Sequence, residues 1–262
     1  MSNKEIEVSA DEVNGIAIGA EPEATEYLNG ASETEPENND SSEDENDHYI
    51  TAGDRKCYIY FDEEFTGLKK DTDLISIGLV DCDGRSFYAE FNDYSMKKLT
   101  PWILENVIQN LEEPATVLDG DHWTMQGNKK EIRTQLFLWL DKYISEGTHI
   151  QFVSDVSHYD FVLLIDLLTG GADALSLPNW ISPCCVDINQ DIATSLYRAK
   201  PKNVSQEEFD RNYIPAFAAF DISREAYISG IPNVSIPGKK HNSLYDAMVI
   251  RAIHQNLWNI EK

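Results

Sequence analysis

Short runs of β-branched and aromatic residues come first in the part of the chain that has a hydrophobic pattern. They predict strands at Cys57–Phe61, Leu74–Val80 and Arg85–Phe91. The last two runs flank Asp81–Gly84, whose Asp-Gly ending is typical of a tight hairpin turn. The same four residues lack the remaining ligands of a calcium-binding loop. We therefore expect a strand followed by an antiparallel hairpin.

Helical patterns alternate with shorter strand patterns after this hairpin. Pro101 occupies a first helical position, and Asn128 with Glu131 three residues later resembles a capping box. The expected helices are Thr100 to about Leu111, Asn128 to about Ile144, Ser157 to Leu168, Ile188–Tyr197 and Asn242–Trp258, with strands at Ile150–Val153 and Cys184–Asp187. This order predicts an α/β fold with a mixed central sheet and helices on its faces. Residues 199–240 are expected to be irregular and to lie beside the site.

The first 49 residues differ in composition from the rest. They contain 15 acidic residues and one base, Lys4, and so carry −14 of the formal net charge of −25. A segment so polar buries too little apolar surface to order itself. We therefore expect an acidic disordered tail at residues 1–54 and a domain at residues 55–262. A solvated tail without a specific partner is the simpler interpretation; the alternative is a partner-binding tail that docks through Val13–Ala20.

Composition and charge exclude several classes of protein. No apolar run approaches the roughly 18–20 residues of a membrane span, and the acidic start does not resemble a signal peptide. The four cysteines have neither disulfide-framework nor zinc spacing, which favours a reducing, cytoplasmic compartment. The residues after the tail are also acidic in sum, which excludes a generally basic nucleic-acid binder. An enzyme that handles phosphates through metal cations stays possible.

Three acidic motifs lie at the ends of the expected elements. After the first strand, Asp62 and Glu64 leave the same face of an extended chain, and Glu63 leaves the opposite face. Two carboxylates on one face repel each other unless a cation lies between them, and Mg²⁺ or Mn²⁺ prefers such oxygen ligands. The other two motifs, at helix starts, contain Asp160, and His241 with Asp246.

The order and placement of these residues resemble the RNase T-like superfamily of 3′–5′ exonucleases, over residues 57–258. His241 lies five residues before the last acid, as in the branch whose four acids are accompanied by a histidine (DEDDh). The sister branch has a tyrosine four residues before that acid, where this chain has Asn242. The stretches DEEFTG, SDVSHYDFVLLIDLL and HNSLYDAMVIRAI also resemble a group of small stand-alone exoribonucleases of bacteria and phages. The resemblance implies an RNase H-like fold and a cytoplasmic enzyme of a bacterial or phage-infected cell.

The resemblance also implies a two-metal phosphodiesterase that uses Mg²⁺ or Mn²⁺. In this family pattern, Asp62 bridges both ions, Glu64 and Asp246 complete the first site, Asp160 holds the second, and His241 removes the proton from the attacking water. Asp155 is a second acid near Asp160, and the family's aromatic-Asp spacing favours Asp160. Surface carboxylates without a metal are the simpler alternative for the whole set.

By the same resemblance, Phe65 and Thr66 would hold the 3′-terminal nucleotide, through an aromatic face and a hydrogen bond to the 3′ hydroxyl. Lys239 and Lys240 are the best-placed cations for backbone phosphates. A second candidate group of cations is Arg198, Lys200 and Lys202. Lysines in loops are about as often simply solvated.

The leading hypothesis is a divalent-metal-dependent 3′–5′ exoribonuclease that acts on single-stranded RNA or RNA 3′ overhangs and releases nucleoside 5′-monophosphates. A deoxyribonuclease of the same fold is the close rival, because only contacts to the 2′ hydroxyl separate the two. The alternative of a different class is a non-catalytic protein that binds nucleic acid or a protein partner through its acidic tail. The family resemblance further allows a homodimer, and no membrane partner is expected.

Overall fold

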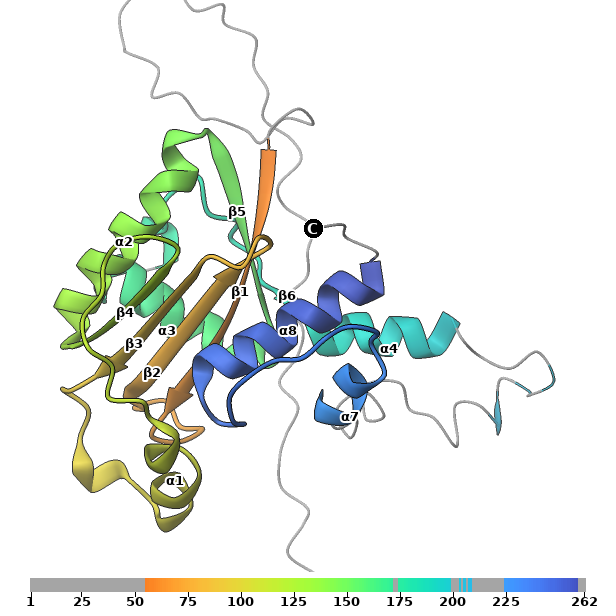
Figure 1. Ribbon diagram of the computed structural model, residues 1–262, viewed down its shortest axis with the longest axis horizontal. Coiled ribbons are helices and arrows are strands. Elements are labelled where there is room, and N and C mark those ends of the chain that lie inside the picture. Colours follow the sequence, from red (N-terminus) through yellow and green to blue (C-terminus); the bar gives the residue numbers. More distant parts are fainter. Residues whose placement is uncertain are drawn as a thin grey trace, which may run out of the picture. The chain divides into compact units, whose positions relative to one another are not determined.

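A six-stranded mixed sheet forms the centre of the molecule. The computed structural model describes residues 55–171, 174–198, 203, 205, 207–208 and 224–258. The strand order is β4-β3-β2-β1-β5-β6 (Figure 1). β2 is antiparallel to its neighbours β1 and β3, and the other neighbouring strands run parallel. The predicted α/β fold with a mixed central sheet is thus confirmed. The predicted tail (1–54), Lys200, Lys202 and the side chain of Arg198 lie outside the described residues.

The strand that carries the first motif is longer than its hydrophobic run. The six strands are β1 (Arg55–Phe65), β2 (Leu74–Asp81), β3 (Ser86–Phe91), β4 (His122–Gly127), β5 (Thr148–Ser154) and β6 (Val186–Asp187). β1 continues to Phe65, beyond the predicted Phe61, because its acidic end still pairs with β2. β6 is shorter than the predicted Cys184–Asp187. β4 was not predicted, because this edge strand is largely exposed and polar and lacks a hydrophobic run.

The helices begin close to the residues that the sequence patterns predicted as their starts. They are α1 (Pro101–Asn106), α2 (Lys129–Ser145), α3 (Ser157–Thr169), α4 (Ile188–Arg198), α7 (Arg224–Ser229) and α8 (Ser243–Trp258), with short 3₁₀ turns η1 (Met96–Lys98), η2 (Ile108–Asn110) and η3 (Ala174–Ser176). The capping box of α2 is confirmed, since Asn128 and Glu131 exchange hydrogen bonds of 3.1 and 2.9 Å. α1 ends before the predicted Leu111, because the chain tightens into η2. In the described part of the chain, no helix has the length and apolar character to cross a bilayer.

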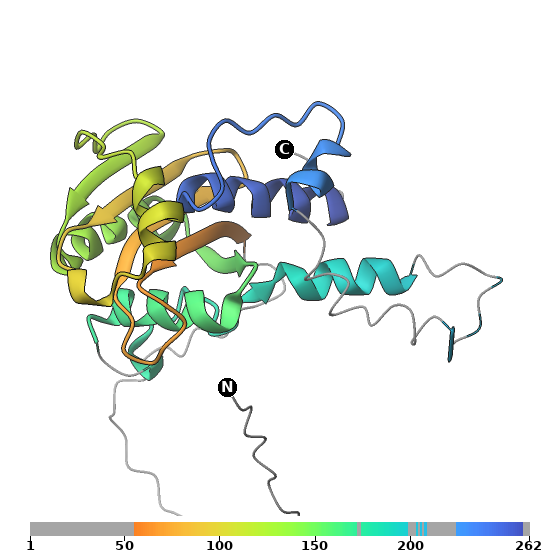
Figure 2. The same ribbon diagram turned by 90° about the horizontal axis from the view of Figure 1, so that it is seen from below.

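Two hydrophobic cores lie on the two faces of the sheet. Ile59 and Phe61 of β1 pack into a core with α2 and α3, which contains Leu136 and Leu164. Tyr60, which points to the other face, packs into a core with α4 and α8. Figure 2 shows α3 and α8 on opposite sides of the sheet. The alternation of β1 continues into the acidic motif, so the direction of Asp62 and Glu64 is set by the buried residues before them.

The start of α8 lies directly on the sheet because of a glycine in β2. A Cβ atom on Gly78 would lie 2.3 Å from the backbone nitrogen of Leu244. Gly78 is also the β2 partner of Asp62. Nearby, the hydroxyls of Ser243 and Ser76 are 3.0 Å apart in a hydrogen bond between α8 and β2. The missing side chain therefore lets the helix that carries Asp246 approach the strand that carries Asp62.

The predicted turn between β2 and β3 is confirmed. Asp81 Oδ1 accepts hydrogen bonds from the backbone N–H groups of Asp83, Gly84 and Arg85, at 2.8 to 2.9 Å. Its other oxygen, Oδ2, accepts a hydrogen bond of 2.6 Å from the hydroxyl of Tyr143. Both oxygens of the Asp81 carboxylate thus accept hydrogen bonds that stabilise the turn and its packing, and they are not arranged to bind a cation.

Candidate active site

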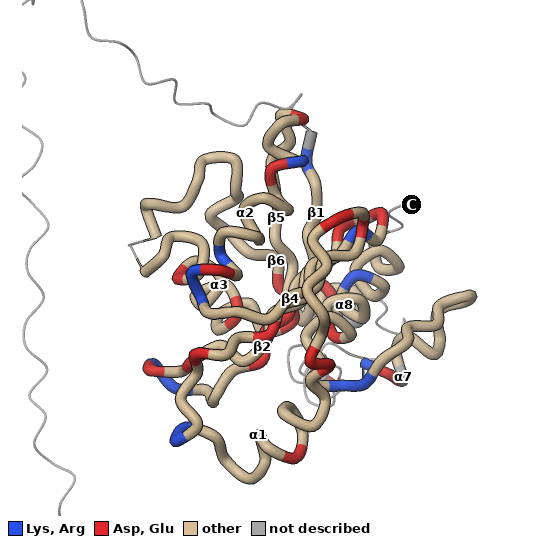
Figure 3. The backbone as a smooth tube through the Cα atoms, turned by 60° about the vertical axis from the view of Figure 1, so that its left-hand side comes forward, with Lys and Arg blue, Asp and Glu red and all other residues tan. Residues whose placement is uncertain are grey.

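Six side chains from four parts of the chain meet in two groups beside the end of β1. Glu64, His241 and Asp246 form one group, and Asp62, Asp155 and Asp160 form the other. Within each group, one potential ligand atom of each residue lies within 4.8 Å of the others. Figure 3 shows stretches with acidic residues at the centre of the tube, whereas most stretches with Lys and Arg lie toward its periphery. The structure therefore brings together the five residues expected from the motifs, and it adds Asp155.

β5 and α3 place the second group of acids. Asp160 lies in the first turn of α3 and is only 2% exposed. The hydroxyl of Ser154, at the end of β5, donates a hydrogen bond of 2.5 Å to Asp160 Oδ2. Asp155 lies in the short connection between β5 and α3 and also faces Asp62. The sequence favoured Asp160 over Asp155, but the structure places both side chains close to Asp62.

The first turn of α8 and the residue before it place the other group. His241 has a left-handed backbone conformation, with φ of 62°, which is uncommon for a residue with a side chain. Its backbone N–H donates a hydrogen bond of 2.7 Å to Asp246 Oδ2. In this conformation the imidazole Nδ1 lies 3.7 Å from Glu64 Oε1. A strained residue with a catalytic type of side chain is typical of functional sites.

Burial and mutual repulsion act together on the acids. Burial, and then the charge of Asp246, raises the pKa of Asp62 well above its ordinary value. Burial is also the main cause that raises the pKa of Asp160 to about 8 and that of Asp246 to about 7. For His241 the carboxylate of Glu64 raises the pKa of the imidazole. The protein therefore holds several carboxylates in a place where their charge is unfavourable without a cation.

Glu63 is a buried acid on the opposite face of β1, as the alternation predicted. Its side chain is 4% exposed, and neither carboxylate oxygen has a hydrogen-bond partner among the described residues. Burial, and then the charge of Asp160, raises the pKa of Glu63 well above its ordinary value. Glu63 thus lies behind the site, where burial disfavours the charged form of its carboxyl group.

A cavity of about 370 Å³ opens beside the first group of acids. Glu64, Phe65 and Thr66 line one side of it, and Trp102 and Ile103 of α1 line the other. Trp102 is 54% exposed, and its ring meets the ring of His241 edge-on at 5.1 Å. Sequence reasoning missed Trp102, although an aromatic residue in the exposed first turn of a short helix is a signal that could have found it. The cavity has a volume typical of a small-molecule site and an aromatic wall.

The two residues expected to hold the terminal nucleotide have different surroundings. Phe65 lines this cavity, and its ring stacks on that of Tyr159 with 6.0 Å between centroids. The hydroxyl of Thr66 accepts a hydrogen bond of 3.0 Å from the backbone N–H of Asp73 and contacts the hydroxyl of Thr72. Thr66 thus closes the loop between β1 and β2, and its hydroxyl is already engaged there.

Cations lie at two places around the site. Lys239 and Lys240 are exposed and immediately precede His241. A second, polar cavity of about 280 Å³ adjoins the first and is lined by Lys69, Lys97 and Lys98. Lys98 forms an ion pair of 2.8 Å with Asp73, which ties η1 to the loop after β1. The sequence offered no sign that residues 69 and 97 lie together, because a hairpin separates them.

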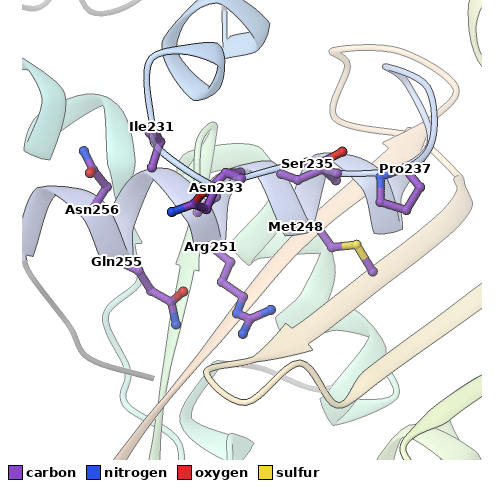
Figure 4. A pocket seen from close by; sticks show the side chains of 11 residues that line it. Ile231, Asn233, Ser235, Pro237, Met248, Arg251, Gln255 and Asn256 are labelled. Carbon is purple, nitrogen blue, oxygen red and sulfur yellow. The ribbon is translucent and has the colours of Figure 1, made fainter.

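A further cavity of about 360 Å³ lies between residues 231–237 and the outer face of α8 (Figure 4). Apolar side chains such as Ile236 and Met248 line it, together with Arg251. The guanidinium of Arg251 donates a hydrogen bond of 2.5 Å to the carbonyl of Cys82. This cavity contains none of the six residues of the two groups, and Arg251 has a structural partner there.

Comparisons with known proteins relate part of the chain to exoribonucleases in sequence. A comparison with protein-family profiles found no match. The chain is 32% identical over 111 residues to the 3'-5' exoribonuclease Rv2179c of Mycobacterium tuberculosis strain H37Rv, and equally to the 3'-5' exoribonuclease MT2234.1 of strain CDC 1551. The match covers 41% of this chain and 59% of either relative. The chain thus spans less than two thirds of the length of these curated relatives.

Among solved structures, the catalytic unit of Neurospora crassa Pan2, with its protease and nuclease domains, is similar to this chain with a TM-score of 0.35. The sequence identity is 14%, over 82% of this chain and 28% of that one.

Proposed function

We propose that the chain is a divalent-metal-dependent 3′–5′ exoribonuclease of the histidine-containing branch, which releases nucleoside 5′-monophosphates. The observation that carries this proposal is the meeting of two groups of oxygen ligands around Asp62 and Glu64 at the end of β1. The exoribonuclease names of the partial relatives support RNA as the substrate. A non-catalytic protein has no evident use for buried acids that repel one another.

The donor set fits hard divalent cations. All ligands other than His241 are carboxylate oxygens, which suit Mg²⁺ and Mn²⁺ rather than zinc or copper. Asp62 and Asp160 would hold one ion, and Glu64 and Asp246 the other, with Asp62 between the two. When bound, the two ions supply charge neutralisation at the phosphate and lower the pKa of the attacking water.

His241 is the general base in this proposal. The Glu64 carboxylate faces Nδ1 at 3.7 Å, which favours a proton on that nitrogen and leaves Nε2 of the neutral ring to accept one. The contact with Trp102 and the fixed backbone of residue 241 orient the ring. The residue can therefore take the proton of the attacking water without reorganisation.

The cavity beside Glu64 is proposed to bind the 3′-terminal nucleotide. The exposed face of Trp102 and the ring of Phe65 offer stacking to any base. Lys69 and Lys97 of the adjoining polar cavity, and Lys239 and Lys240 near His241, are the cations available for phosphates. If these four lysines of the described residues are the ones that contact phosphates, binding should depend only modestly on salt.

The direct test uses a single-stranded RNA labelled at its 5′ end and the DNA of the same sequence, each with Mg²⁺, Mn²⁺ or EDTA. We expect stepwise shortening of the RNA from the 3′ end with either metal and no reaction in EDTA. Equal or faster shortening of the DNA would replace the exoribonuclease with a deoxyribonuclease. Binding of RNA without any cleavage would favour the non-catalytic alternative.

The first variant to test is Asp62→Asn. It should abolish hydrolysis while the thermal unfolding curve stays cooperative, because the carboxylate shared by both groups is removed while the size of the side chain is kept. Turnover of labelled RNA and circular dichroism provide the two measurements. Lys130→Gln, on the exposed start of α2, is the matched control and should leave turnover unchanged. Normal turnover in Asp62→Asn would contradict the assignment of the site.

A further inference from the structure

An arginine from α7 reaches into the acid site, and the proposed chemistry gives it no role. Arg224 Nε lies 3.8 Å from Asp155 Oδ2, and its side chain is only 15% exposed. α7 packs on α8 through Tyr227 and Ile228, which lie against the core on that face of the sheet. The guanidinium is thus held at the site by a packed element rather than by a free loop.

Both the backbone carbonyl and the side-chain carboxylate of Asp155 have polar partners. Asn189 of α4 donates a hydrogen bond from its side-chain amide to the backbone carbonyl of Asp155 and accepts one from the guanidinium of Arg224. Asp187 accepts a hydrogen bond of 2.8 Å from the backbone N–H of Asn189 and another, of 3.0 Å, from the hydroxyl of Ser157. These contacts join α7, α4 and the start of α3 around the connection that carries Asp155.

The geometry points to Arg224 as a positioning residue, which acts through Asp155 as an additional ligand of a divalent ion in the group with Asp62 and Asp160. A carboxylate ligand holds its place when a neighbouring donor fixes its orientation. Arg224 engages one oxygen of Asp155, and the Asp155 carboxylate lies within 4.8 Å of the ligand atoms of Asp62 and Asp160. This inference rests on the proposed function, because it assumes that these acids hold a metal ion.

Mn²⁺ binding to the metal-free full-length protein, measured by isothermal titration calorimetry, tests the inference without any substrate. Arg224→Gln should weaken Mn²⁺ binding about 10- to 100-fold, the usual effect of removing a partner of a metal ligand. Asp155→Asn should weaken it at least as much. The double variant should bind no more weakly than Asp155→Asn alone, because Arg224 acts through Asp155. Arg224→Lys should restore part of the affinity, since it keeps the positive charge.

Arg251→Gln is the matched control. Arg251 is also a partly buried arginine, and it lies on the outer side of α8, where its guanidinium meets the carbonyl of Cys82 (Figure 4). This variant should bind Mn²⁺ like the unmodified protein. Circular dichroism shows whether each variant is folded.

Two results would overturn the inference. One is Mn²⁺ binding in folded Arg224→Gln that is as tight as, or tighter than, in the unmodified protein. The other is unchanged binding in Asp155→Asn, which decides the matter even if Arg224→Gln does not fold. The proposed function fails separately, if the unmodified protein binds Mn²⁺ but does not shorten RNA. A protein that shortens RNA and whose Arg224→Gln variant binds Mn²⁺ normally would sink the inference alone.

Discussion

His241 shows how a single residue holds together the group that it forms with Glu64 and Asp246. Its backbone N–H donates a hydrogen bond to Asp246, its ring faces Glu64, and its backbone has a left-handed conformation. A side chain held in this way loses little conformational entropy when it accepts a proton, which is the advantage of a preorganised base. These contacts give His241 the fixed orientation that the proposed general base requires.

We predict that His241→Ala lowers turnover by roughly 10²–10⁴, the usual contribution of a general base, while Mn²⁺ binding survives. In the unmodified protein, turnover should rise with pH through the titration of the imidazole, because only the neutral ring accepts a proton. In the metal-free protein the Glu64 carboxylate raises the pKa of His241, and divalent ions bound to these acids would counter that effect. Rates of RNA shortening between pH 5 and 9 measure both effects.

Water bound to a divalent ion also titrates in this range, so the pH profile alone does not show which group causes the rise in turnover. The His241→Ala variant distinguishes the imidazole from the metal-bound water. The rise near neutral pH should flatten once the imidazole is gone. Full turnover with an unchanged pH profile in His241→Ala would remove this residue from the mechanism.

The sequence predicted which acids lie together but not the residues around them, for a physical reason. Asp62 and Glu64 follow a buried run whose alternation determines their face, and Asp246 follows a helix start, so local patterns position them. Trp102 and Arg224 reach the site only through the packing of α1 and α7, and no local pattern reports that packing. The same holds for Asp155, which the family spacing placed second to Asp160.

At the scale of elements, the contact of α8 with β2 decides whether the two groups meet. Gly78→Ala should destabilise the protein by about 1–3 kcal/mol, the common cost of overpacking, because its Cβ would lie 2.3 Å from backbone atoms of α8. Since α8 must move away, RNA turnover should fall by more than the loss of folded protein explains. Thermal unfolding and turnover per folded molecule measure the two effects.

Gly230→Ala is the control for this prediction. A Cβ there would meet the carbonyl of Tyr227 at 3.3 Å, away from β2. This control should keep nearly normal stability and turnover. A Gly78→Ala protein with the same properties as the control would show that the close approach of α8 is not needed.

The elements that sequence reasoning missed, or to which it gave the wrong bounds, are those with the weakest patterns. β4 is an exposed edge strand, β6 has two residues, and α7 lies within the Pro-, Asn- and Ser-rich stretch 199–240. Hydrophobic periodicity identifies elements that bury a whole face, such as α2 and α8. Short elements that pack through one or two side chains leave no such signal, although α7 carries a residue of the site.

At the scale of the whole molecule, the repulsion among the acids should make stability depend on pH and on metal. In the folded state the pKa of Asp160 is about 8 and that of Asp246 about 7, against an ordinary value of 3.8. The folded protein therefore binds protons that the unfolded chain has lost. The stability that these protons contribute is fully present below about pH 4 and is lost as pH rises toward 8.

We predict that the melting temperature in EDTA falls as the pH rises from about 4 to 8. The fall should be larger in the unmodified protein than in the control variant Asp160→Asn. Mn²⁺ should raise the melting temperature most at pH 8, where the carboxylates are charged and bind the ion. Scanning calorimetry at several pH values, with EDTA or Mn²⁺, measures both effects. A melting temperature in EDTA that rises from pH 5 to 8 as much in the unmodified protein as in Asp160→Asn would contradict this account of the site.

The acidic segment at the start of the chain gives the last prediction. Residues 1–49 carry −14 of the net charge, and we propose that residues 1–54 form a tail separate from the catalytic domain at 55–262. A shortened chain that begins at Arg55 should fold and shorten an RNA oligonucleotide at least as fast as the full chain. Removing so much negative charge should ease the approach of an anionic substrate, most of all at low salt, where screening is weak.

The measurement is the kcat/KM of the shortened chain divided by that of the full chain, at salt concentrations from 20 to 300 mM. This ratio should fall toward one as the salt concentration rises. A full-length chain in which the tail acids are replaced by Asn and Gln separates charge from length, and it should behave like the shortened chain. A shortened chain that is insoluble or inactive would show that residues 1–54 are part of the working domain.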